Sequence, residues 1–232
     1  MLASVESPKQ PKARAGRRPA KPPLGRAEIV EAAVRVSEAE GIDRVTMRRI
    51  AAELSTGAAS LYVYVRNTED LHAAVLDHLL ARVRASRPRG DWRARVRGTL
   101  LKYAAVLLER PALARMALAA PMSGDNYLAL VDRLLGYLFE GGVGEREAAW
   151  AVDLLLLVAT ASAAEHATWR GSARAGAELA ELERIVRGAD PRTHPNVARA
   201  KDELMTGGGV RLGWHIDTVL RGLGSNRRRR EK

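Results

Sequence analysis

The chain of 232 residues contains no cysteine, and only 4% of its residues are aromatic. The absence of cysteine excludes disulfides, thiolate metal sites and cysteine nucleophiles, and it fits a reducing cytosol. Few aromatic or β-branched residues are available for strands, whereas Ala, Leu, Arg and Glu, which favour helices, are abundant. The composition therefore predicts an all-α fold.

Long apolar runs are also missing from the chain. No run reaches the roughly 18 to 20 residues that a membrane span needs, and no apolar core follows the basic N-terminus as it does in a secretory signal. The five histidines show no metal-ligand spacing, and the chain has neither a glycine-rich phosphate loop nor a nucleophile elbow. We expect no membrane contact, no metal, no cofactor and no enzymatic activity.

The net charge of +11 is confined to the two ends of the chain. Residues 1–26 carry a net charge of +6 and residues 221–232 carry +5, so the body between them is neutral. Five prolines stand among the charges of residues 1–24, which predicts a disordered basic arm, and residues 225–232 form a short basic tail. Such tails are typical of nucleic-acid-binding proteins, although they also serve to keep proteins soluble.

Residues 25–71 have the pattern of a small helical domain. Apolar residues recur at three- and four-residue intervals from 29 to 39, the period of a helix with one buried face, and Gly41 suits the end of that helix. Thr46 is a good N-cap for a second, short helix over residues 47–54. The first two helices of the domain are therefore predicted from local pattern alone.

A third and a fourth helix follow. Residues 55–57 predict a turn, residues 58–65 a third short helix, and Thr68 can cap a fourth helix that extends to about residue 87. Two short helices joined by a three- to four-residue turn, after a longer supporting helix, form a helix-turn-helix.

In a helix-turn-helix, the second short helix enters the major groove of DNA. Ala58, Ala59 and Ser60 begin this helix with small side chains that allow close approach to the bases. Tyr62 and Tyr64 are two residues apart and cannot share one helical face, so at least one hydroxyl points outwards, where it can contact a phosphate. The alternative is that both rings are partly buried packing residues.

A set of residues in this region resembles the DNA-binding domain of the TetR family of bacterial transcriptional regulators. The set comprises Arg26, Ile29, Ala32, Ala33, Gly41, the run from Thr46 to Leu54, the run from Ser60 to Val65, and Glu69, Asp70 and Leu71. The resemblance implies an all-helical homodimer with a ligand-binding and dimerisation domain over residues 72–224. It also implies repression at a palindromic double-stranded DNA operator, from which a small-molecule effector releases the protein.

The resemblance also implies which residues contact DNA. They are Thr46, Arg48, Ala58, Ala59, Ser60, Tyr62, Tyr64, Arg66 and Thr68. Four positions depart from the family's usual residues: Ser55 replaces a turn Gly, Thr56 a Val, Val65 a Phe and Thr68 a Lys.

The DNA-binding domain has little positive charge of its own. Residues 27–71 hold five arginines against eight acidic residues. We therefore expect the basic arm to compensate, with Arg17 and Arg18 suited to a narrow minor groove.

The remainder of the chain predicts a helical domain after a break at residues 88–91. Helices are expected at 92–109, 111–119, 124–141, 145–170, 172–187 and 209–223, with a long loop over 188–209. The helices near 145–170 and 209–223 are the most apolar, and the resemblance implies that they form the dimer interface. The alternative is that both pack only within their own subunit.

A ligand pocket is expected in this second domain. The candidate lining is Tyr103, Met116, Met122, Tyr127, Glu165, His166 and Trp169, because Met and aromatic residues line adaptable apolar sites. The alternative for each is ordinary core packing.

Asp153 lies in the apolar run near 145–170, with Thr160 seven residues on and on the same predicted face. A buried carboxylate is costly unless it is paired, so we expect Asp153 to pair across a dimer or with a ligand.

The effector is expected to be apolar or cationic. The C-terminal half is distantly similar to that of tetracycline repressors, but residues 115–119 lack the His that helps to bind magnesium–tetracycline. Binding of that complex is therefore not expected.

Two other functions remain open at this point. One is a non-specific, basic DNA-architectural protein that acts through its tails. The other is a small-molecule-binding or scaffold protein whose 48–68 surface is inert to DNA. The expected location is the bacterial cytoplasm, at the nucleoid.

Overall fold

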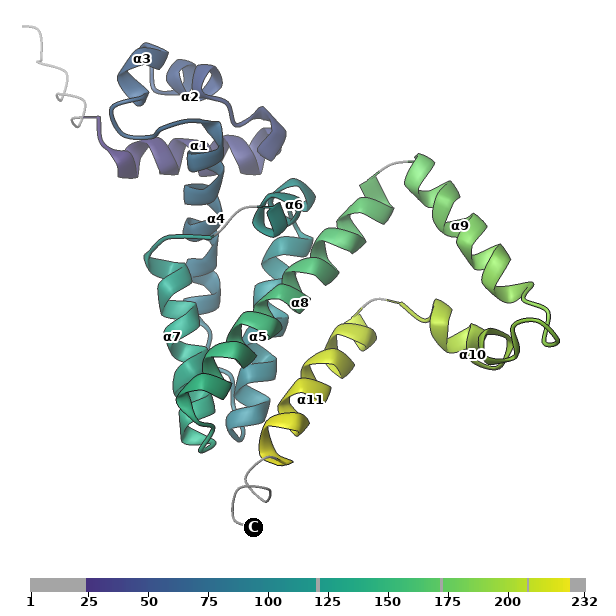
Figure 1. The fold of residues 1–232 in the computed structure, drawn as a ribbon. Helices are drawn as coiled ribbons and strands as arrows, with labels where there is room; N and C mark the ends of the chain where they lie inside the picture. Colours follow the sequence, from purple (N-terminus) through teal and green to yellow (C-terminus); the bar gives the residue numbers. More distant parts are fainter. Residues whose placement is uncertain (1–23, 120–121, 172, 208, 226–232) are drawn as a thin grey trace, which may run out of the picture.

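The computed structural model describes residues 24–119, 122–171, 173–207 and 209–225 (Figure 1). These residues contain eleven α-helices and one 3₁₀ helix and no strand, so the all-α prediction is confirmed. The predicted basic arm, with Arg17 and Arg18, and most of the basic tail lie outside the described residues.

The N-terminal helices form a small bundle at one end of the molecule (Figure 1). They are α1 (Arg26–Glu40), the 3₁₀ helix η1 (Ile42–Arg44), α2 (Met47–Glu53), α3 (Ala58–Leu61) and α4 (Thr68–Ala85). The apolar face of α1 is buried in one core that also contains Ile50 of α2, Leu61 of α3 and Leu71 of α4. Thr46 caps α2 as predicted, because its hydroxyl accepts the amide N–H of Arg49 at 3.2 Å.

Two predicted boundaries in this bundle are wrong. The sequence predicts a third helix over residues 58–65, but α3 ends at Leu61 and the following residues form a turn. Thr68 is not the cap of α4, since the side chain of Asn67 accepts the amide N–H of Asp70 at 2.8 Å. Asn67 can do this because its own backbone is extended, as an N-cap requires.

The turn between α2 and α3 contains Ser55 in the left-handed region, at φ 52°, the only non-glycine residue with positive φ among those described. The amide of Ser55 donates to Ala52 O at 3.1 Å, and the amide of Thr56 donates to Ala51 O at 2.9 Å. This pair of bonds is a Schellman motif, in which glycine is the preferred left-handed residue. Ser55 therefore occupies a strained position that sets the angle between α2 and α3.

The C-terminal domain is a bundle around one long helix, α8. Its members are α5 (Trp92–Leu108), α6 (Pro111–Ala119), α7 (Asp125–Glu140), α8 (Glu145–Gly171) and α11 (Gly209–Ser225). The buried side of α8 is rich in alanine, including Ala148, Ala151, Ala159 and Ala163. Small side chains let α5, α6, α7 and α11 approach the α8 backbone closely.

Helices α4 and α7 cap each other. Asp77 of α4 accepts the amide N–H of Tyr127 at 2.8 Å at the start of α7. In return, Arg133 of α7 donates to Val83 O at 3.0 Å at the end of α4, and also to the carbonyl of Arg84. Gly124 permits this contact, because its φ is +126° and an added Cβ would lie 2.2 Å from the Asp77 carboxyl carbon. The clamp holds α4, which carries the N-terminal bundle, on the C-terminal domain.

Helices α9 (Ala173–Arg187) and α10 (Pro195–Met205) project away from the body (Figure 1). The long loop predicted over 188–209 is wrong in part, because α10 lies within it, with Pro195 at a position in the first turn that needs no N–H donor. Leu182, Ile185 and Leu204 remain exposed on these two helices.

Helix α8 is the long apolar helix that the sequence predicts near residues 145–170. By length and composition, Glu145–Trp169 is long and apolar enough to cross a membrane, but half of the stretch is buried inside the protein. The core helix of a soluble protein passes the same test. The buried alanines described above show that α8 packs in the core of the C-terminal domain.

Candidate functional site

The turn that follows α3 presents an exposed face. Leu61 and Val65 are buried and anchor this segment to the bundle. Between them, the side chains of Tyr62 and Tyr64 are exposed to 57% and 37%. Neither ring lies in the buried core, although each is partly covered by its surroundings. Both phenols lie on the outer surface, although on a turn rather than on two faces of a helix.

Small and polar side chains surround the two tyrosines. Ala59 and Ser60 of α3 are exposed, and Ala58 is half-buried. Thr46 and Arg48 of α2 are exposed as well, and Arg48 forms no ion pair with any residue that the structure describes. A surface with small side chains on α3, two phenols and an unpaired guanidinium can approach a DNA groove closely and contact its phosphates.

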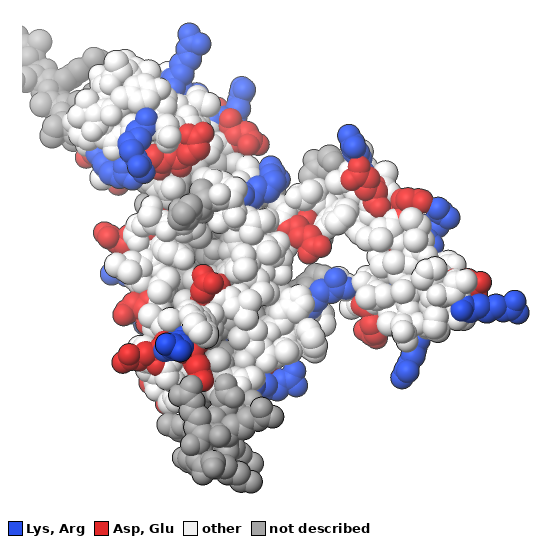
Figure 2. Space-filling model, viewed as in Figure 1, with Lys and Arg blue, Asp and Glu red and all other residues white. Residues whose placement is uncertain are grey.

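Arg49, next to Arg48, is instead held within its own domain. Its Nε lies 3.1 Å from Glu40 Oε1, and its Nη1 lies 3.0 Å from Glu53 Oε2. The hydrogen bond from Arg49 lowers the pKa of the Glu40 carboxyl. Figure 2 shows basic and acidic side chains interspersed over this end of the molecule rather than a single basic patch. Arg49 therefore adds little positive charge to the exposed surface, because Glu40 and Glu53 neutralise it.

Arg26 connects the start of α1 to the end of the exposed turn. Its Nη1 donates to the carbonyl oxygen of Tyr64 at 2.9 Å, and its Nη2 lies 3.5 Å from Asp70 Oδ1. Asp70 also accepts the amide N–H of Arg66 at 3.0 Å. Burial alone would raise the pKa of Asp70, but the bonds from Arg66 and Arg26 outweigh it and hold that pKa below its ordinary value. The motif residue Arg26 thus positions Tyr64.

The start of α4 is fixed by two more contacts. Asn67 caps it, as described above, and Nε2 of His72 lies 2.8 Å from the carbonyl oxygen of Val45, just before α2. Arg66 is exposed and Thr68 is half-buried at this helix start. The N-terminal end of an α-helix favours anions, so these two positions flank a place where a phosphate can sit.

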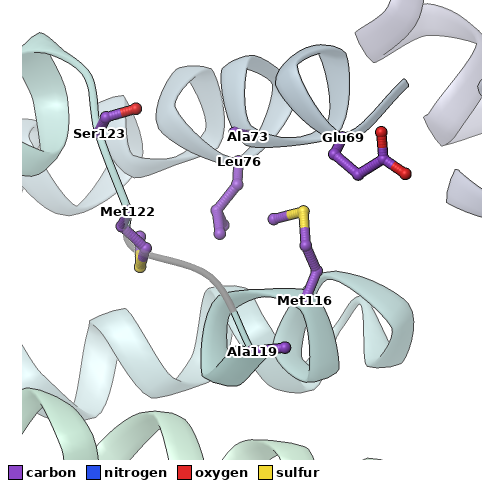
Figure 3. A pocket seen from close by; sticks show the side chains of 7 residues that line it. All are labelled: Glu69, Ala73, Leu76, Met116, Ala119, Met122 and Ser123. Carbon is purple, nitrogen blue, oxygen red and sulfur yellow. The ribbon is translucent and has the colours of Figure 1, made fainter. Parts of the chain in front are cut away.

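A cavity of about 180 Å³ lies directly beyond this helix start (Figure 3). It is lined by Glu69, Ala73 and Leu76 of α4, Met116 and Ala119 of α6, and Met122 and Ser123 of the following loop. In Figure 3, α4 and α6 form opposite walls, with Glu69 at one end and Ser123 at the other. An occupant would contact both the helix that carries the DNA-binding bundle and the C-terminal domain.

The structure brings two of the seven predicted pocket residues, Met116 and Met122, to this cavity. Tyr103 does not line it: the ring is buried, and its hydroxyl lies 2.6 Å from Thr160 Oγ1 and 3.3 Å from Met122 Sδ. Burial raises the pKa of Tyr103 to about 12. Tyr103 therefore supports the cavity through Met122 rather than facing it.

The other four predicted residues lie elsewhere. Tyr127 starts α7, and Glu165, His166 and Trp169 lie on the last turns of α8, outside the lining. Sequence reasoning missed the α4 wall. Glu69, Ala73 and Leu76 recur at intervals of four and three residues, the spacing of one helical face, but residue type alone gave no reason to select them.

Asp153 is exposed in the protomer, whereas Thr160 is buried, so the expected pairing of Asp153 across a dimer or with a ligand stays a prediction. The two positions share a side of the helix but not a neighbour. Tyr103 of α5 covers Thr160, while Asp153 lies near Tyr127 at an open edge. Burial, and then the negative charge of Asp153, raises the pKa of Tyr127.

Helices α8 and α11 each leave large apolar side chains exposed. On α8, Trp150, Leu154 and Leu157 are exposed to 67%, 44% and 53%. On α11, Val210 and Trp214 are exposed to 76% and 60%. Packing within the subunit therefore accounts for only part of the apolar surface of these helices, and a monomer with such a surface invites association.

Comparison with known proteins agrees with this arrangement. Residues 29–75 match the family "Bacterial regulatory proteins, tetR family", and residues 85–208, more than half of the chain, match "Tetracyclin repressor-like, C-terminal domain". The chain belongs to the TetR family. It is a DNA-binding transcriptional regulator, and the matched ranges correspond to the N-terminal bundle and the C-terminal domain.

Solved structures from Streptomyces coelicolor are similar over most of the chain. A transcription regulator, SCO7704, is 46% identical with a TM-score of 0.73, covering 88% of this chain and 96% of its own. ActR in complex with actinorhodin is 30% identical with a TM-score of 0.76, covering 88% and 97%. The repressor DrrR1 of Streptomyces coeruleorubidus is 33% identical, but the match spans only 60% of this chain and 54% of that relative.

The relatives are transcriptional regulators rather than enzymes. Among the described residues, no group of three or more His, Asp or Glu side chains is arranged to hold a metal ion.

Proposed function

We propose that this protein is a homodimeric repressor that binds a palindromic operator and is released by a small molecule. The observation that carries the proposal is the exposed face formed by Arg48, Ser60, Tyr62 and Tyr64, held in place by the buried Leu61 and Val65. In the proposed complex, Ala58, Ala59 and Ser60 enter the major groove. Thr46, Arg48, both tyrosines, Arg66 and Thr68 contact bases or phosphates.

The effector occupies the cavity between α4 and α6. A ligand there touches Ala73 and Leu76 on the first three turns of α4, directly after Arg66 and Thr68. The far half of α4 is clamped to α7 through Asp77 and Arg133. A ligand that separates α4 from α6 therefore tilts the DNA-binding bundle about the clamp. ActR, solved with actinorhodin at 30% identity, supports a ligand-responsive role.

Dimerisation uses the exposed apolar faces of α8 and α11. Two copies that bury Trp150, Leu157 and Trp214 against one another remove these side chains from water. The pairing also places two DNA-binding bundles on one operator, which explains the expected palindrome. The protein acts where the operator is, at the nucleoid.

Footprinting on the DNA upstream of the protein's own gene tests the proposal. A short, palindromic protected region supports a repressor, whereas uniform coverage would show the non-specific architectural protein. Arg48→Ala should weaken protection at unchanged thermal stability. Arg49→Ala is the matched control, because Arg49 pairs with Glu40 and Glu53. This variant should lower thermal stability more than it weakens binding to DNA.

Deleting residues 1–20 should weaken operator binding and reduce its dependence on salt. The deletion removes five Lys and Arg residues, including Arg17 and Arg18, whose charges are available to displace counterions. Fluorescence anisotropy with labelled operator at several salt concentrations measures the slope. An unchanged slope would show that the arm does not contact DNA.

A further inference from the structure

The walls of the cavity between α4 and α6 favour an apolar group. Leu76, Ala73 and Ala119 are aliphatic, and Met116 and Met122 contribute flexible thioethers that adapt to rings. Ser123 is the single hydroxyl of the lining and lies at one end (Figure 3). Such walls can bury a small apolar body but offer almost nothing to a ligand with many polar groups.

The one charged residue of the lining is Glu69, at the opposite end from Ser123. Its neighbour Asp70 is satisfied by Arg26 and by the amide of Arg66. Glu69 has no such partner: within the described part of the chain, no Lys, Arg or His pairs with it. An exposed carboxylate thus stands unneutralised at the rim of an apolar cavity.

The lining also lacks any positive counterpart. None of the seven residues is Lys, Arg or His, so an anionic ligand would meet Glu69 without a compensating charge. A neutral ligand would gain only the apolar contacts. A cation gains both, since its charge can lie beside Glu69 while its apolar part lies between α4 and α6.

The volume limits the apolar part to about one ring. The cavity measures about 180 Å³, and an apolar protein cavity of roughly 150 Å³ holds benzene. We propose that the ligand is a small organic cation, an ammonium group joined by a short linker to a single aromatic or aliphatic ring. The inference rests on the proposed function, in which this cavity is the effector site.

Three matched probes test the charge preference on the full-length protein: 2-phenylethylamine, 2-phenylethanol and 3-phenylpropionate. Binding is measured by calorimetry or by ligand-observed NMR at neutral pH. The amine should bind about three- to fivefold more tightly than the alcohol, the scale expected for a partly exposed ion pair. The carboxylate should bind more weakly than the alcohol.

Two variants assign the preference to this cavity. Glu69→Gln should equalise the amine and the alcohol while the alcohol still binds. Ala119→Phe, at an exposed position of the lining, should fill the cavity and weaken both. Glu31→Gln, which removes one exposed acid of α1 that does not line the cavity, is the matched charge control and should leave the preference unchanged.

The outcomes distinguish a wrong ligand class from a wrong effector site. If amine and alcohol bind equally to the natural protein and Ala119→Phe weakens both, the cavity is a ligand site but the proposed cation class is wrong. If no probe binds, or if Ala119→Phe changes nothing, the cavity is not the effector site and both proposals fail there. Operator release by the amine, measured in parallel by anisotropy, then connects binding to regulation.

Discussion

At the scale of single residues, the DNA-binding surface depends on side chains that hold the backbone as much as on those that face outwards. Arg48 and Arg49 are adjacent, yet only Arg49 is paired, with Glu40 and Glu53. Arg26 holds the carbonyl of Tyr64 and the carboxylate of Asp70. A charge count of the domain cannot separate these roles.

Arg26→Ala should destabilise the N-terminal bundle by about 1 kcal/mol, because Asp70 loses a charged partner. The pKa of Asp70 is lowered in the fold, so its contribution to stability is present above the unfolded pKa of about 3.9 and is lost as the pH falls through the lower, folded value. Denaturation followed from pH 7 to pH 2 should show the variant unfolding at higher pH. A difference that does not shrink in acid would contradict this assignment.

Ser55→Gly should stabilise the protein by roughly 0.5–1 kcal/mol, because glycine accepts the left-handed conformation without the steric cost that a Cβ brings. The hydrogen bonds of the turn stay as they are. Urea denaturation measures the gain. Ser55→Ala, which keeps the Cβ at φ 52°, is the control and should bring no such gain.

At the scale of elements, the contact between α4 and α7 determines how the two domains are joined. Each helix supplies a side chain to the unpaired backbone groups at an end of the other. Asp77 and Arg133 are 56 positions apart in the numbering, so neither local propensity nor helical period reveals them as partners.

Gly124→Ala should be strongly destabilising, by roughly 2–3 kcal/mol, since the new Cβ combines a positive φ with a clash against Asp77. Asp77→Ala should cost about 1–2 kcal/mol through the lost cap. The double variant should cost less than the sum, because removing the carboxylate removes the clash. Thermal or urea unfolding of all four proteins completes the cycle, and strict additivity would show that the two residues do not interact.

At the scale of the whole molecule, the exposed faces of α8 and α11 carry large apolar side chains that packing within the subunit does not cover. Leu157→Glu or Trp214→Glu should convert the proposed dimer to a monomer, because a charge is desolvated in an apolar interface. Light scattering coupled to size exclusion measures the mass. The monomer should keep its helical content but bind the palindromic operator far more weakly. A dimer that persists in both variants would move the interface elsewhere.

The sequence by itself determined what depends on neighbours along the chain. Helical period and composition predicted the all-α fold, and Thr46 was recognised as a cap because a cap acts three residues away. The motif from Arg26 to Leu71 was enough for the family. Local pattern was less reliable at boundaries, where Asn67 competed with Thr68, and in the segment after residue 188, where α10 forms.

Only the tertiary structure decided which residues meet. Tyr103 is directed to Thr160 and Met122 rather than to a ligand, and Glu69 faces a cavity made with α6, a helix more than forty residues later. Asp153 and Thr160 share a helix side, but only Thr160 is covered by a neighbouring helix. Burial, pairing and cavities arise from the packing of distant helices. Their effect on a side chain is therefore absent from the chain's local pattern.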